Sequence, residues 1–152
     1  MRNHGINLLR QGKSINMSKP HSISEPRNFS LDNKLRLAVL ISGGGTNLQA
    51  LIDSCSRPNY PALINIVISN QSKAGGIQRA TNANIKTVII EHEKFNGREQ
   101  FEDQISTILE ANEIELVCLA GFMRILGEKF VTKWKNRLIN VHPSLLPSFK
   151  GL

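Results

Sequence analysis

Residues 35–55 read LRLAVLISGGGTNLQALIDSC, and this stretch decides the fold of the chain. It begins with an apolar run, LRLAVLIS at 35–42, which predicts a buried strand. Three glycines follow at 43–45, and TNLQALIDSC at 46–55 then has apolar residues at helical spacing. A buried strand that passes through a glycine turn into a helix is typical of an α/β protein with a parallel sheet.

The alternation of strand and helix continues along the chain. Apolar runs predict four more strands, at 63–69, 85–90, 114–121 and 137–142. Helical spacing predicts three more helices, at 74–84, 97–113 and 127–136. The fold class is therefore α/β, a doubly wound and mainly parallel sheet with helices on both faces, whose ligands are expected at the carboxyl ends of the strands.

Two of the helices have clear apolar faces. In the helix at 97–113, the inward face is predicted to carry Phe101, Ile105, Ile108 and Leu109. In the helix at 127–136, the residues predicted to point inward are Phe130, Val131 and Trp134.

The composition is that of an ordinary soluble domain. The chain has 152 residues, 40% of them apolar and 20% charged, which is enough for one domain with a core. No apolar run approaches the roughly 20 residues that span a bilayer. Cys55 and Cys118 lie far apart, without a CxxC motif or a His/Cys cluster, so we expect no metal site and two reduced, buried thiols. These observations favour a cytoplasmic protein with no membrane partner.

The positive charge is concentrated at the start of the chain. Residues 1–34 contain six basic and two acidic residues, a net charge of +4 out of the total of +7. They show no sustained periodicity, so we expect a disordered basic extension at 1–34 and a folded domain at 35–152. The folded part is nearly balanced, which disfavours nucleic-acid binding and suits small phosphorylated substrates.

The extension has no continuous apolar region, which disfavours a secretory signal. Two interpretations stay open for it. It is either a transit peptide, or an overextended start for which Met17 is the alternative initiator, and the second is the simpler interpretation.

The glycine loop is the first candidate site. Glycines allow a close approach of the backbone, and the start of the following helix offers free N–H groups, so the loop is suited to cradle a phosphate. The sequence matches neither GxGxxG nor GxxxxGKS/T, which disfavours dinucleotide and ATP binding. The alternative is a tight turn with Thr46 as the N-cap of the helix.

The ends of the last two strands are further candidates. GFMRIL at 121–126 could form a flat pocket for an aromatic ligand beside Arg124, or could simply pack into the core with a solvated Arg. Asn140 and His142 are two apart, so both side chains leave the same face of the last strand. An amide and an imidazole on one face could stabilise an oxyanion and move a proton.

Three motifs together resemble one enzyme family. VLISGGGTNLQALID, LAGFMRIL and NVHPSLLPSFKGL, in this order and spacing, are similar to the folate-dependent phosphoribosylglycinamide formyltransferases, and the resemblance runs from about Leu35 to Leu152. It implies a formyltransferase or Rossmann-like fold and transfer of a formyl group in de novo purine (IMP) biosynthesis. The donor would be 10-formyltetrahydrofolate and the acceptor the amine of 5-phosphoribosylglycinamide, with no metal.

The resemblance also implies roles for individual residues. The substrate phosphate would be bound by Gly45, Thr46 and Asn47. The folate would be contacted by Arg98, Met123, Arg124, Ile125, Leu126 and Asn140. The catalytic residues would be Asn140 and His142.

Two related families fit the motifs less well. Methionyl-tRNA formyltransferases share the SLLP loop but typically continue with an Arg-Gly-Ala-Ala-Pro run, and formyltetrahydrofolate deformylases typically have a His-His-Ser-Phe-Leu-Pro version. The His142-Pro143-Ser144 order and the triple glycine favour the glycinamide enzyme. A relative of the methionyl-tRNA enzymes stays as an alternative.

The family places its catalytic carboxylate, an Asp, beyond the point that corresponds to Leu152. We therefore expect residues 35–152 to be the N-terminal domain of the enzyme, truncated after the fifth strand, with the activity of the chain itself left open. The other interpretations are a non-enzymatic remnant, a small nucleotide-binding module, or half of a split enzyme that binds the phosphoribosyl substrate and needs a complementing C-terminal half.

Overall fold

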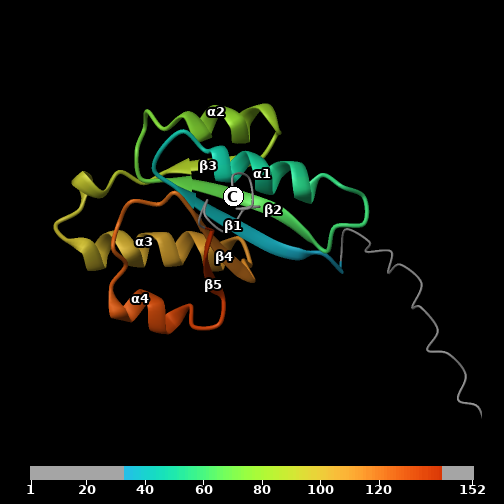
Figure 1. Cartoon of the computed structure of the whole chain (residues 1–152). Coiled ribbons are helices and arrows are strands. Elements are labelled where there is room, and N and C mark those ends of the chain that lie inside the picture. Colours follow the sequence, from blue (N-terminus) through green and yellow to red (C-terminus); the bar gives the residue numbers. More distant parts are fainter. Residues whose placement is uncertain (1–32, 142–152) are drawn as a thin grey trace, which may run out of the picture.

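The computed structural model describes residues 33–141, so all but the last two residues of the predicted extension, and also His142, lie outside the described part. Five strands form one sheet in the order β3-β2-β1-β4-β5, and every neighbouring pair is parallel (Figure 1). The strands are β1 (Leu35–Ile41), β2 (Ala62–Ser69), β3 (Lys86–Ile89), β4 (Leu116–Ala120) and β5 (Leu138–Val141).

Helices cover both faces of this sheet. One face packs against α1 (Thr46–Cys55) and α2 (Gly75–Asn82), and the other against α3 (Arg98–Ala111) and α4 (Glu128–Lys133) (Figure 1). The predicted doubly wound α/β fold is confirmed, and each predicted strand and helix is present with ends shifted by at most a few residues. A short 3-10 helix, η2 (His92–Lys94), was not predicted.

The central part of strand β1, from Leu37 to Ile41, is apolar because both of its faces are covered. Ala38 and Leu40 belong to the core beneath α3 and α4, whereas Leu37, Val39 and Ile41 belong to the core beneath α1 and α2. Because successive side chains of a strand point to opposite faces and both faces are covered, no position of the strand centre is left for a polar residue.

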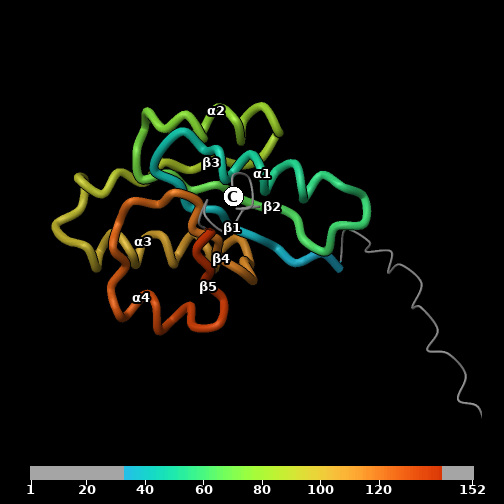
Figure 2. The backbone as a smooth tube through the Cα atoms, in the orientation of Figure 1, coloured from blue at the N-terminus to red at the C-terminus, as the bar shows by residue number. Residues whose placement is uncertain are grey.

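The path of the chain creates a switch point beside β1. From β1 the chain runs outward to β2 and β3, and it then crosses to β4 on the other side of β1, as the tube in Figure 2 shows. Connections leave β1 and β4 in opposite directions, so a crevice opens between the carboxyl ends of these two strands. The glycine loop follows one of these ends, and residues 121–126 follow the other.

The predicted inward face of the last helix is correct for two residues and wrong for one. Phe130 and Trp134 are 2% and 1% exposed, whereas Val131 is 45% exposed. Residues four apart share a helix face, and the residue next to Phe130 is turned about 100° away from it. The Trp134 Nε1–H also donates to Ser106 Oγ on α3 over 3.2 Å, which fixes the indole in the core.

Both cysteine thiols are free. Cys118 on β4 is fully buried, as predicted, whereas Cys55 at the end of α1 is only half-buried. Burial raises the pKa of the Cys118 thiol to about 11 and also raises the pKa of Cys55. Within residues 33–141, no helix combines the length and the apolar character needed to cross a membrane.

We expect Phe130→Ala to lower the free energy of unfolding by about 3–5 kcal/mol, because it leaves a cavity between α3, α4 and the sheet. Val131→Ala is the matched control, and it should change the free energy by less than about 1 kcal/mol since its side chain is half in solvent. Urea unfolding of the two variants and the parent measures both values, and equal losses would contradict the assigned helix face.

The two thiols should differ in reactivity. At pH 8 about one Cys118 in a thousand would be a thiolate, since its pKa is about 11, and the thiolate is the reactive form. We expect iodoacetamide to modify Cys55 slowly and Cys118 only after unfolding, as measured by peptide mass spectrometry. Fast modification of Cys118 in the folded chain would contradict its buried position.

Candidate functional site

The glycine loop turns the chain from β1 into α1 through a left-handed residue. Gly45 has φ 76° and ψ 28° and occupies the N-cap position, and no side chain caps the helix. Thr46 is the first residue of the helix, so the interpretation of Thr46 as the N-cap is wrong. The left-handed conformation at the cap explains this, because it favours glycine and is strained for a β-branched residue.

The loop is held against the start of α2. A Cβ added at Gly45 would lie 2.5 Å from the Gly76 Cα, so both backbones need glycine to approach this closely. The Gly76 N–H donates to Gly43 O over 3.0 Å, and the Arg79 Nε–H donates to Gly44 O over 2.8 Å. The loop is therefore a braced structure, with its carbonyl groups tied to α2.

The first turn of α1 is available for an anion. The first four N–H groups of a helix have no partner within the helix, and here no side chain caps them. These groups and the positive end of the helix dipole favour a negatively charged ligand. Asn47 in this turn is 9% exposed, and its Nδ2–H donates to Val141 O over 3.3 Å, which ties α1 to β5 beside Asn140.

A cavity of about 420 Å³ spans the switch point. Its walls come from the glycine loop and the first turn of α1 on one side and from the end of β4 on the other: Gly43, Gly44, Gly45, Thr46, Asn47, Ala120, Gly121 and Met123. The three residues predicted to bind the phosphate therefore lie in one cavity with the start of the segment predicted to bind the folate.

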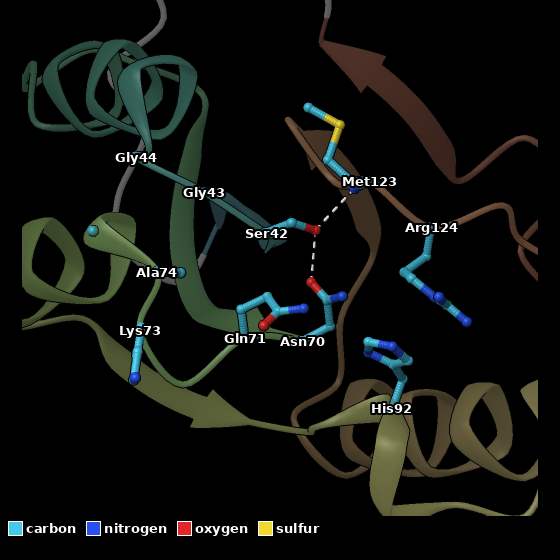
Figure 3. A pocket seen from close by; sticks show the side chains of 11 residues that line it. Ser42, Gly43, Gly44, Asn70, Gln71, Lys73, Ala74, His92, Met123 and Arg124 are labelled. Atoms are coloured by element: carbon cyan, nitrogen blue, oxygen red, sulfur yellow. Dashed lines mark hydrogen bonds between the residues drawn. The ribbon is translucent and has the colours of Figure 1, made fainter.

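A second cavity, of about 520 Å³, shares Gly43, Gly44 and Met123 with the first, and its lining is shown in Figure 3. Its lining includes Lys73, His92 and Arg124 and no acidic residue. His92 and Arg124 also line a neighbouring cavity of about 270 Å³, to which Arg98 contributes. Lys73 after β2, Arg98 at the start of α3 and Arg124 after β4 thus lie around these two adjoining cavities, which we call the trough and which suit an anionic ligand.

The predicted folate residues behave differently from one another. Met123 and Ile125 are 81% and 83% exposed, so packing of these two side chains into the core is excluded. Leu126 is half-buried against the core, as the alternative interpretation required. Arg98 at the start of α3 and Arg124 after β4 line the same cavity.

Asn140 lies on β5, exposed, with its backbone in register with Leu119 of β4. It lines none of the three cavities, and its predicted partner His142 is outside the described residues. Among residues 33–141, no group of three or more His, Cys, Asp or Glu side chains gathers in a way that could hold a metal.

Two site residues were missed in the sequence. The Ser42 hydroxyl donates to Asn70 Oδ1 over 2.6 Å and accepts from the Met123 N–H over 2.8 Å, and Figure 3 shows Ser42 between these two partners. Both Ser42 and Asn70 directly follow buried strands. The rule that polar residues at the carboxyl ends of parallel strands meet would have found them, had it been applied to the first two strands.

The comparison with known proteins gives one consistent result. The formyl transferase family matches residues 35–152. The human trifunctional purine biosynthetic protein adenosine-3 is 49% identical over 147 residues, which cover 96% of this chain and 15% of that protein. The phosphoribosylglycinamide formyltransferase of Escherichia coli (strain K12) is 41% identical over 118 residues, which cover 78% of this chain and 56% of that enzyme.

The fold agrees with this match. The structure of phosphoribosylglycinamide formyltransferase from Coxiella burnetii, in complex with CHES, superimposes with a TM-score of 0.70 at 46% identity. The superposition covers 78% of this chain and 56% of that chain. The chain thus spans about half the length of the bacterial relatives that it matches.

The left-handed backbone of the loop can be tested with two alanine variants. We expect Gly45→Ala to lower the free energy of unfolding by at least about 1–2 kcal/mol, because of its positive φ and the contact with Gly76. Gly44→Ala is the matched control, since a Cβ at Gly44 meets nothing within 4 Å. Thermal or urea unfolding gives both values, and equal stability of the two variants would show that the loop is not braced as described.

Proposed function

This chain belongs to the formyl transferase family, and on that premise we propose that it transfers a formyl group from 10-formyltetrahydrofolate to the amine of phosphoribosylglycinamide in purine synthesis. The observation that carries the proposal is the cavity at the switch point. It joins the uncapped start of α1 to the exit of β4, so that an anionic substrate and a second ligand would meet between the two. Bacterial relatives at 41–42% identity are named phosphoribosylglycinamide formyltransferases, which supports the proposal.

For the ribonucleotide, the proposed site is the first turn of α1. The phosphate would accept hydrogen bonds from the backbone N–H groups at Gly45, Thr46 and Asn47. These groups are available because no side chain caps the start of the helix. The lack of a Cβ at the loop allows the phosphate to approach the backbone closely. The amine of the substrate would then extend along the cavity toward the end of β4.

For the formyl donor, the proposed site is the segment after β4. Met123 and Ile125 present exposed apolar side chains, which suit the flat ring system of a folate, and Leu126 would support them from the core side. Folates end in a glutamate, and its carboxylates would pair with the guanidinium groups of Arg98 and Arg124.

The catalytic groups proposed for the transfer are Asn140, in the fifth strand β5, and His142, which follows that strand in the sequence. When the amine attacks the formyl carbon, the oxygen becomes an oxyanion, which Asn140 and a protonated His142 would stabilise by hydrogen bonds. The attacking amine must release a proton, which passes to solvent, and the departing folate nitrogen needs one, for which His142 is the proposed donor. The bond from the Asn47 side chain to Val141 O supports this arrangement, because it ties the phosphate site to the strand that carries Asn140.

The remaining proposals concern the domain and its compartment. We keep the division of the chain into an extension at 1–34 and a formyltransferase domain at 35–152, supported by the family match from residue 35 and the start of β1 at Leu35. The cytoplasm stays the proposed compartment, supported by two free thiols in the described part of the chain.

The proposal predicts a specific loss of turnover. In a transfer assay with both substrates, Asn140→Ala should lower the rate by about 10²–10³, the usual effect of removing one oxyanion donor. Asn82→Ala is the control, because Asn82 is an exposed residue of α2 whose side chain accepts only from Gln78, and it should leave the rate unchanged.

Two outcomes would contradict parts of the proposal. Full activity of Asn140→Ala would show that Asn140 takes no part in the chemistry. It would not contradict the proposed substrates. Failure of the wild-type chain to bind either the ribonucleotide or the folate, measured by calorimetry, would contradict the proposed function itself.

A further inference from the structure

The segment 121–127 between β4 and α4 carries exposed side chains without the support of a helix or strand. Its tip is formed by Met123, Arg124 and Ile125, all of which are exposed. On either side of the tip, Phe122 and Leu126 are half-buried against the core. A ligand that binds this tip needs it in one shape, so the contacts that hold its backbone determine how well the site is preorganised.

The first of these contacts is at Ser42. The Met123 N–H donates to Ser42 Oγ over 2.8 Å, and the Ser42 hydroxyl in turn donates to Asn70 Oδ1 over 2.6 Å. The direction is determined by chemistry, because an amide oxygen only accepts and a backbone N–H only donates. The hydroxyl is thus oriented by one bond to receive the other (Figure 3).

Asn70 gives this chain of bonds a fixed origin. Its side chain is 3% exposed, and its backbone N–H donates to Ile41 O over 3.3 Å. The bonds therefore run across the carboxyl ends of three neighbouring strands, β2, β1 and β4, and end at the start of the tip. The Ser42 hydroxyl makes both bonds, so without it Asn70 and Met123 would no longer be connected.

The second contact is at Glu102 on α3. This carboxylate is 4% exposed, and its Oε1 accepts from the Gly127 N–H over 2.7 Å at the end of the segment. The same oxygen lies 3.9 Å from Arg98 Nε. A buried carboxylate needs partners, and here they are the end of the segment and one of the two guanidinium groups that line the trough.

Neither contact touches the anchors of the glycine loop. The carbonyl groups of Gly43 and Gly44 are tied to α2 through Gly76 and Arg79. The segment after β4 is tied to Ser42 and Glu102 instead. The two halves of the site therefore have separate supports, and it is possible to disturb one without the other.

We propose that Ser42 and Glu102 are positioning residues that hold the two ends of segment 121–127 in the shape that receives the formyl donor, independently of the ribonucleotide site. This inference rests on the proposed function for the identity of the ligand. The tethering of the segment itself rests on the geometry alone. Neither residue is proposed to contact a substrate.

Amide hydrogen exchange of the full chain tests the tethers without any ligand. Ser42→Ala should speed exchange at the Met123 amide at least about tenfold, because its acceptor is lost, and Ser42→Thr should restore protection. At the other end, Glu102→Leu should speed exchange at the Gly127 amide, whereas Glu102→Gln keeps an acceptor oxygen and should not. Unchanged exchange in the core strands β1 and β4 shows that each variant is folded.

Binding of 5-formyltetrahydrofolate, a stable formyl folate, and of phosphoribosylglycinamide tests the consequence. Ser42→Ala should raise the Kd for the folate about tenfold and leave the Kd for the ribonucleotide within about twofold. Glu102→Leu should weaken only the folate, whereas Glu102→Gln, which keeps the acceptor for the Gly127 N–H, should leave both Kd values within about twofold. Arg79→Leu is the matched variant, because it removes the bond to Gly44 O, and it should show the reverse pattern.

Hydrogen exchange tests whether the tethers exist, and ligand binding tests whether they position the folate site. Protection of the Met123 amide that survives Ser42→Ala would overturn the tether, and so would a threonine variant as impaired as the alanine variant. Equal loss of both ligands in Ser42→Ala would overturn the positioning role and leave only a general structural one. A wild-type chain that binds no folate would contradict the proposed donor and thereby this role, while the exchange data still decide whether the tethers exist.

Discussion

The close contact between the backbones at Gly45 and Gly76 is the constraint on which the site depends. It allows α1 to start directly at the end of the central strand and brings the start of α2 against the same loop. Because Gly45 is left-handed and lacks a side chain, the first N–H groups of α1 stay uncapped. A larger residue at either position would move a helix away from the loop and alter the anion site before any ligand is bound.

The position of β1 at the centre of the sheet explains why separate functions meet at one edge. Its two neighbours, β2 and β4, end beside it, so Asn70, Ser42 and Met123 follow three strands that lie side by side. The glycine loop is supported from α2, and the segment after β4 is supported from β1 and α3. Two ligands could therefore be bound by neighbouring loops whose supports are distinct.

Positively charged side chains gather around the cavities at the carboxyl ends of the strands. Arg98 at the start of α3, Arg124 after β4 and Lys73 after β2 line adjoining cavities without an acidic residue. Glu102, whose Oε1 lies 3.9 Å from Arg98 Nε, is buried and accepts from the Gly127 N–H. The lining of the trough therefore suits an anionic ligand, while the buried carboxylate of Glu102 holds the Gly127 N–H.

The sequence by itself determined the strands, the helices and the two covered faces, because each strand of the sheet is a short, mainly apolar run and each helix has its own spacing. It also located the glycine loop and the residues after β4, since they stand directly after such runs. Only the tertiary structure decided that Gly45 rather than Thr46 precedes the helix, and that Ser42, Asn70 and Glu102 are linked to the loops of the site. The physical reason is that these features depend on contacts between residues far apart in the chain, such as Gly45 with Gly76 and Ser42 with Met123, which no local pattern records.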